Sequence, residues 1–140
     1  MKRFNFNLQK ILQLRKYREE ECKIELGRAV SALSEIENKI KETAICRHNA
    51  AAERFANTGA AAGIQAWDNY ILRLDQEAEK LAYQAARAEL VVEEKRRLYL
   101  DASQELKVIE KLREKREKEY RAEMFAAETA ELDDLWRKPS

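Results

Sequence analysis

The chain has 140 residues, of which 38% are charged and 45% hydrophobic, with 3 Gly, 1 Pro and a net charge of +1. So few helix-breaking residues, together with an aromatic content of 8%, favour long helices sharing a narrow seam over a compact domain with a thick core. The small net charge argues against nucleic-acid binding as the main role, and apolar positions that recur in register argue against disorder. We therefore expect one all-α domain over residues 1–140.

The first predicted helix covers residues 4–57 and carries seam positions at alternating spacings of about four and three residues. This spacing is typical of a coiled coil. Two polar residues, Arg15 and Glu19, interrupt it. The seam consists of Leu8, Leu12, Arg15, Glu19, Cys22, Leu26, Ala29, Leu33, Ile36, Ile40 and Thr43.

The cysteines and the N-terminal sequence indicate a reducing environment. Cys22 and Cys46 lie on the same predicted helix, roughly 36 Å apart at about 1.5 Å per residue, which is too far for a disulfide bond. The opening "MKRFNFNLQKIL" alternates apolar and polar residues, unlike a secretory signal, and no apolar run approaches membrane-spanning length. We expect a cytoplasmic protein that does not insert into the membrane.

A turn is predicted at about residues 58–63, in the sequence "NTGAAAG". Gly59 and Gly63 lie here, and glycine is the usual residue at helix ends. Thr58 could cap a second helix that starts early.

The second predicted helix covers residues 64–136 and repeats the same spacing, with Lys95 as its one polar seam member. The two helices are therefore predicted to form an antiparallel coiled-coil hairpin. The second seam consists of Trp67, Ile71, Leu74, Ala78, Leu81, Ala85, Ala88, Val92, Lys95, Tyr99, Ala102, Leu106 and Ile109.

One register of this hairpin sets small residues against large ones. In this register Ala29 faces Val92, and Leu12 faces Ile109. The second helix then has no partner after about residue 117 and overhangs by roughly 20 residues, or about 30 Å.

Charge is distributed unevenly along the chain. Residues 1–28 hold eight Lys and Arg against four Glu, and residues 107–121 hold seven against four. Residues 53–79 hold two against five. The hairpin is thus predicted to have a basic end, where the two termini meet, and an acidic end at the turn.

A cluster of large apolar residues follows the turn. Trp67, Ile71 and Leu74 lie on the seam and could simply close the hairpin. Ile64 and Tyr70 lie off the strict register, and Trp and Tyr are favoured at protein interfaces, so a docking patch is the alternative.

The sequence lacks the usual signs of catalysis. It has no glycine-rich phosphate loop, no metal-binding CxxC or HExxH pattern and no nucleophile paired with a base. The single histidine, His48, has only ordinary helix neighbours. We expect neither an enzyme nor a bound cofactor or metal.

The two ends of the chain resemble those of the flagellar export protein FliJ family. The N-terminal pattern falls on Phe4, Phe6, Leu8, Gln9, Ile11, Leu12, Leu14 and Arg15. The C-terminal pattern falls on Leu106, Glu110, Lys111, Leu112, Lys115, Arg116, Tyr120 and Glu123.

This resemblance implies a component of the flagellar type III export apparatus, at the inner membrane of the flagellar base. The implied fold is similar to the central stalk of rotary ATPases. Its implied partners are the hexameric export ATPase, the export gate's membrane protein and export chaperones. By analogy, the ATPase ring would contact Lys10, Arg15, Arg18, Lys111, Arg113, Lys115, Arg116 and Tyr120, and the gate or chaperones would contact Ile64, Trp67, Tyr70, Ile71 and Leu74.

Two other classes of function are open to such a sequence. A structural coiled coil unrelated to export could pair its overhangs in a homodimer. A nucleic-acid binder could use residues 107–121, but acidic neighbours and the lack of stacking aromatics other than Tyr120 argue against it.

Overall fold

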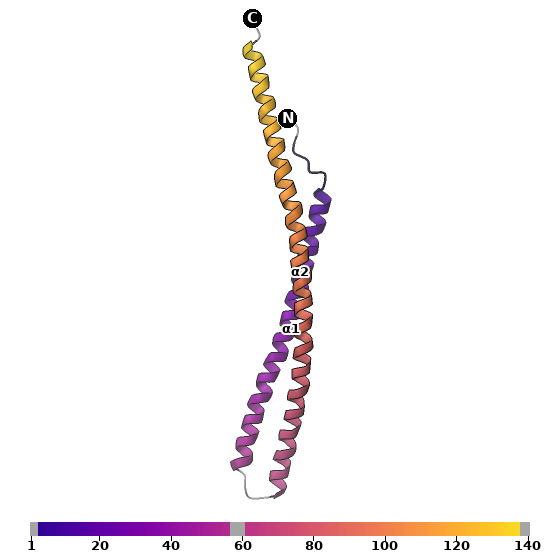
Figure 1. The fold of residues 1–140 in the computed structure, drawn as a ribbon. Coiled ribbons are helices and arrows are strands. Elements are labelled where there is room, and N and C mark those ends of the chain that lie inside the picture. The colour runs from indigo at the N-terminus through magenta and orange to yellow at the C-terminus, as the bar shows by residue number, and fades with distance from the viewer. Residues whose placement is uncertain (1–2, 57–60, 138–140) are drawn as a thin grey trace. The chain divides into compact units, whose positions relative to one another are not determined.

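The computed structural model describes residues 3–56 and 61–137 (Figure 1). Helix α1 spans Gln9–Ala56 and helix α2 spans Ala61–Arg137. Within these described ranges there is no β-strand. The chain is therefore an all-α helical hairpin, which confirms the fold class predicted from the sequence.

Helix α1 begins at Gln9, later than the predicted start near residue 4. Residues 3–8 are not helical, and they end in a turn where the Gln9 N–H donates a hydrogen bond to the Phe6 carbonyl oxygen at 3.1 Å. The reason is the alternation of Phe4, Phe6 and Leu8 with two exposed asparagines. An extended chain places alternate side chains on one side, whereas a helix would scatter them.

Helix α2 begins at Ala61, inside the segment predicted as a turn. Alanines are strong helix formers, and Gly63 fits into the first turn of the helix without a positive φ angle. The preceding part of the predicted turn, including Thr58 and Gly59, lies outside the described residues. The C-terminal end of α2, at Arg137, lies next to its predicted end at residue 136.

The described residues form two compact units. The first, here called the terminal unit, contains residues 3–22 and 99–137; the second, here called the hairpin unit, contains residues 23–56 and 61–98. Each unit is built from one part of α1 and one part of α2. The expectation of a single domain over residues 1–140 stays a prediction.

The predicted seams contain the residues that the helices bury, apart from Ala50, which lies beyond the predicted end of the first seam at Thr43. Every member of both seams, from Leu8 to Thr43 and from Trp67 to Ile109, is either buried or half-buried. The intervening positions are mostly exposed, so a single stripe on each helix carries the packing.

The terminal unit has a small apolar core. Its buried members are Phe6, Leu12, Leu106 and Ile109, so Leu12 and Ile109 belong to one cluster, as the predicted register requires. Phe4, Leu8 and Leu112 pack against this cluster. Past Tyr120, α2 contains no buried residue up to Arg137, which confirms that the second helix overhangs.

Three ion pairs across the hairpin unit agree with its antiparallel register. Ala29, Ala50, Leu81 and Val92 are its buried apolar residues. Each ion pair joins α1 to α2, and partners further along α1 lie further back along α2. The pairs are Glu25 with Lys95 at 3.1 Å, Arg47 with Asp75 at 2.6 Å and Arg54 with Asp68 at 2.5 Å.

The core of the terminal unit gives a first prediction. Leu12 is 1% exposed, so Leu12→Ala should lower the free energy of unfolding by about 2–5 kcal/mol through lost burial and a cavity. Leu14, on the same helix, is 66% exposed, and Leu14→Ala should change it by less than about 0.5 kcal/mol. Urea unfolding followed by circular dichroism measures both; equal effects would show that the seam is not the source of stability.

Candidate functional site

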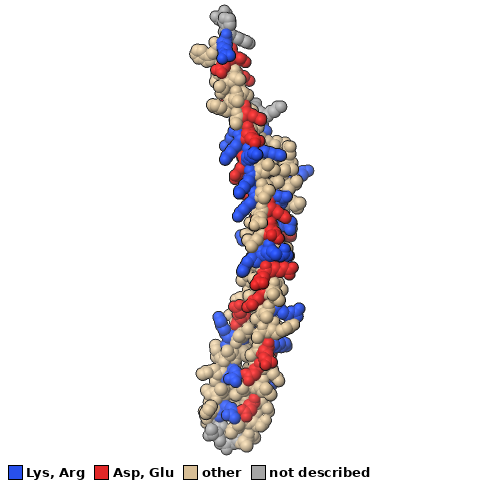
Figure 2. Space-filling view, in the orientation of Figure 1, with Lys and Arg blue, Asp and Glu red and all other residues tan. Residues whose placement is uncertain are grey.

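Eight residues of the basic end were expected to contact the ATPase ring. Four of them are exposed and have no partner among the described residues. Lys10, Lys111, Arg113 and Lys115 are exposed, and within the described part of the chain none of them makes an ion pair or hydrogen bond. In Figure 2, blue side chains gather along the stretch of α2 that is orange in Figure 1. This part of the surface is available to an acidic partner.

The lysines of this stretch form a line along α2. Lys107, Lys111, Lys115 and Lys118 follow one another at spacings of four, four and three residues, which places them on one face of a helix. We call these four residues the lysine row. All four are exposed, and by helical position they lie opposite the seam that contains Ile109.

Two members of the lysine row, Lys107 and Lys118, were not among the residues expected from the sequence. Their spacing is visible in the sequence, but heptad periodicity identifies the buried seam and not the face opposite it. Arg113, by contrast, lies next to the seam and outside this row.

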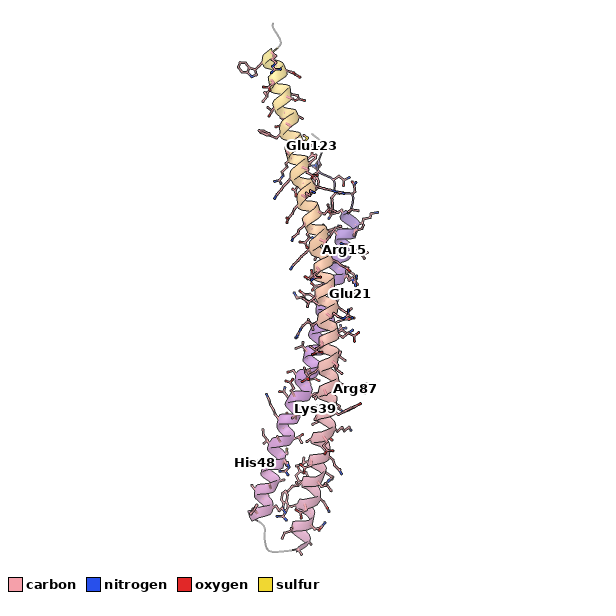
Figure 3. The ribbon with its side chains drawn as sticks, viewed as in Figure 1. Arg15, Glu21, Lys39, His48, Arg87 and Glu123 are labelled. Atoms are coloured by element: carbon pink, nitrogen blue, oxygen red, sulfur yellow. The ribbon has the colours of Figure 1, made fainter. Side chains whose placement is uncertain are left out.

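Arg15 and Arg18 form hydrogen bonds within the chain. Arg15 Nη1 donates to the Glu105 carbonyl oxygen at 2.8 Å, and Arg18 Nη1 donates to the Glu105 carboxylate at 2.9 Å. Arg15 is labelled in Figure 3, on α1 beside α2. These two arginines therefore brace the terminal unit, and a partner would have to compete with Glu105 for them.

Arg116 and Tyr120 contact the extended N-terminal segment. The Arg116 guanidinium lies 5.8 Å from the centre of the Phe6 ring, within the range of a cation–π interaction. The Tyr120 and Phe4 rings are 5.6 Å apart and tilted by 46°. Residues 3–8 thus cover a part of α2 that was expected to have no partner in the chain.

The apolar cluster after the turn is only partly accessible. Ile64, Trp67, Tyr70, Ile71 and Leu74 are all half-buried in the hairpin unit. The Trp67 and Tyr70 rings meet edge to face at 6.1 Å, and the Arg73 guanidinium lies 5.9 Å from the Tyr70 ring centre. These residues contribute to packing and keep some surface exposed.

Two nearby residues expose more apolar surface than this cluster. Phe55 on α1 is 80% exposed and Leu72 on α2 is 56% exposed. Both lie off the predicted seams, so sequence reasoning that followed the seams passed over them. They belong to the hairpin unit and could extend its contact surface.

Two side chains have shifted pKa values. The hydrogen bond from Arg54 to Asp68, and then the charge of that carboxylate, raise the pKa of Arg54. A hydrogen bond with Glu21, and then its charge, raise the pKa of Tyr17. Tyr17 is 63% exposed and the Arg54 side chain 39%, so these shifts reflect local pairing at the surface.

The described residues offer no group of three or more His, Cys, Asp and Glu side chains that could hold a metal ion. His48 is exposed on α1 (Figure 3), and the free thiols of Cys22 and Cys46 are half-buried and exposed, respectively. No described helix is long and apolar enough to cross a membrane.

Two long antiparallel helices with a seam core and charged outer faces define a coiled-coil protein that offers helix surfaces to other proteins. The family model of the flagellar FliJ protein matches residues 4–137, and the chain belongs to this family. It is accordingly a component of the flagellar export apparatus, in a family of non-catalytic components. Searches of curated proteins and of solved structures found no match.

The contact of residues 3–8 with α2 gives a second prediction. Phe6 is 5% exposed, and Phe6→Ala should lower the free energy of unfolding by about 3–5 kcal/mol, because the core cluster and the Arg116 contact are lost together. Phe55→Ala, at a residue that is 80% exposed, is the matched control and should cost less than about 0.5 kcal/mol. Thermal unfolding measures the stability of both variants. If Phe6→Ala left the stability unchanged, the contact of residues 3–8 with α2 would not stabilise the terminal unit.

Proposed function

We propose that the chain acts as a stalk and adaptor of the flagellar export apparatus. In this proposal the terminal unit contacts the hexameric export ATPase. The hairpin unit contacts the membrane protein of the export gate, or export chaperones. The protein would work in the cytoplasm, at the inner membrane of the flagellar base. Family membership over residues 4–137 supports this assignment to the export apparatus.

The observation that carries the ATPase contact is the lysine row. Its four ammonium groups lie on one helix face and stay unpaired within the described residues, next to Glu110, Glu114 and Glu117 on the neighbouring face. Unpaired charges of one sign attract an acidic surface and raise the rate of association. An acidic surface on the ATPase would therefore meet the lysine row.

The structure refines which basic residues to test. Arg15 and Arg18 bond to Glu105, and Arg116 contacts Phe6, so replacing them would disturb the fold as well as any interface. Lys111 and Lys115 have no such role, and neither do Lys107 and Lys118. Reversing the charge of the lysine row therefore separates binding from folding.

A third prediction tests the ATPase contact. The chain with Lys107→Glu, Lys111→Glu and Lys115→Glu should keep its helical circular dichroism but bind the purified export ATPase at least about tenfold more weakly. It should also lose the stimulation of ATP hydrolysis that we expect of the wild-type chain. A pull-down and a hydrolysis assay measure the two effects.

The control for this experiment reverses three exposed lysines of the hairpin unit, Lys39→Glu, Lys41→Glu and Lys80→Glu. It makes the same change in net charge away from the lysine row and should leave binding unchanged. An equal loss of ATPase binding in both variants would show that net charge, and not the lysine row, determines binding. Full stimulation by the lysine-row variant would refute the proposed contact.

A fourth prediction concerns the gate. Phe55→Ala combined with Tyr70→Ala removes one exposed and one half-buried aromatic side chain from the hairpin unit, and should weaken binding to the cytoplasmic part of the gate protein by about tenfold. Binding to the export ATPase should not change. Tyr83→Ala removes a 64% exposed aromatic ring outside the predicted contact cluster and serves as the control. Gate binding that resists the double substitution would direct the search to another surface.

A further inference from the structure

The last turns of α2 carry an apolar stripe that nothing in the terminal unit covers. We call residues 122–137 the acidic tip; Glu123, near its start, is labelled in Figure 3. Phe125 is 72% exposed, Leu132 56% and Trp136 87%. They follow one another at spacings of seven and four residues, so they lie in one line along the helix over about 16 Å. Leu135, 71% exposed, lies beside this line.

The same segment has a charge opposite to that of the residues before it. Residues 122–137 contain five acidic side chains and one basic one, Arg137, whereas residues 107–121 hold seven basic side chains against four acidic ones. The acidic side chains are Glu123, Glu128, Glu131, Asp133 and Asp134.

This charge is unfavourable for an isolated helix end. The C-terminal end of a helix carries partial negative charge, so acidic side chains there are repelled, and Asp133 and Asp134 lie in or next to the last turn of α2. Only Arg137 is basic in that turn. Lys and Arg side chains of a partner would relieve this repulsion.

A hollow on the acidic tip has the chemistry to hold such a side chain. It is lined by Met124, Ala127, Glu128 and Glu131. The apolar pair suits the aliphatic stem of a Lys or Arg, and the two carboxylates suit its charged head. By helical position this hollow lies next to the apolar stripe.

The charges also decide which occupant the stripe suits. In a homodimer formed stripe against stripe, Glu128, Glu131 and Asp133, which flank the stripe, would face the same acidic side chains of the second copy. An anionic lipid surface would repel the tip for the same reason. A protein groove with an apolar floor and a rim of Lys and Arg complements both features of the tip.

We propose that the acidic tip is a docking helix for such a groove on another protein of the export apparatus. Phe125, Leu132 and Trp136 enter the groove, and Glu128, Glu131 and Asp133, which flank the stripe, pair with its basic rim. This surface has the opposite charge to the lysine row, so the two cannot bind the same kind of surface. The inference does not depend on the lysine row binding the ATPase.

The test uses the full chain and three purified probes: the export ATPase, the cytoplasmic part of the gate protein and an export chaperone. Titration calorimetry measures binding of each probe to three chains. The first is the wild type. The second carries Leu132→Ser and Trp136→Ser, and the third carries Glu128→Gln, Glu131→Gln and Asp133→Asn.

We expect at least one probe to bind both variants about tenfold or more weakly than the wild type. For the charge-neutral variant, helix content should stay equal or rise, because repulsion at the helix end is removed. Weaker binding together with a better helix separates a role in docking from a role in folding. Higher salt should weaken wild-type binding more than it weakens binding by the charge-neutral variant.

Two controls match these variants in chemistry. Leu14→Ser with Leu90→Ser removes two leucines that are each 66% exposed outside the tip. Glu35→Gln, Glu37→Gln and Glu42→Gln neutralises three exposed carboxylates of α1. Both controls should bind every probe as the wild type does.

Unchanged binding of all three probes to both tip variants overturns the inference, as does a wild-type chain that binds none of them. A wild-type dimer in light scattering that the tip substitutions dissociate would assign the stripe to a second copy instead. Wild-type binding to anionic phosphatidylserine vesicles that the tip substitutions abolish would assign it to lipid. The lysine-row variant, run in the same titrations, reports separately on the proposed ATPase contact.

Discussion

The two helices can bury only the stripe that each turns toward the other, and the remaining features of the structure follow from this constraint. Seam positions from Leu8 to Thr43 and from Trp67 to Ile109 supply the buried surface, while residues between them stay mostly in solvent. A two-helix structure has no third layer to cover its outer faces. Those faces are therefore free to carry charge and aromatic side chains for partners, and partner binding can change without altering the core.

The sequence predicted this seam well because coiled-coil burial depends on spacing alone. The alternation of small and large residues also identified the register, which the shared core of Leu12 and Ile109 supports. The predicted start of α1 at residue 4 was wrong, because the heptad seam begins only at Leu8 and the alternation of Phe4 and Phe6 with asparagines before it has a period of two. This alternation with a period of two, which is typical of an extended chain, is visible in the sequence.

The partner-binding residues were harder to predict, because exposure and pairing depend on the partner helix. Arg15 and Arg18 look like free basic residues until Glu105 is placed beside them. Phe55 looks like one more apolar helix residue until its side chain is found to be 80% exposed. Not every charged residue is therefore available to a partner protein. The lysine row can be identified only after the residues in ion pairs and hydrogen bonds within the chain are excluded.

The apolar seam of the hairpin unit does not by itself exclude an alignment slipped by one heptad, and the ion pairs help to exclude it. A heptad seam repeats itself, so a slip of one helix by seven residues, about 10 Å, would again set apolar positions against apolar positions. Such a slip would separate Glu25 from Lys95, Arg47 from Asp75 and Arg54 from Asp68 at the same time. Each exposed pair is weak alone, but together they distinguish one alignment from its near copies. Part of what aligns the hairpin unit is therefore charge that salt can screen, whereas the attraction between its helices comes from a seam that salt does not screen.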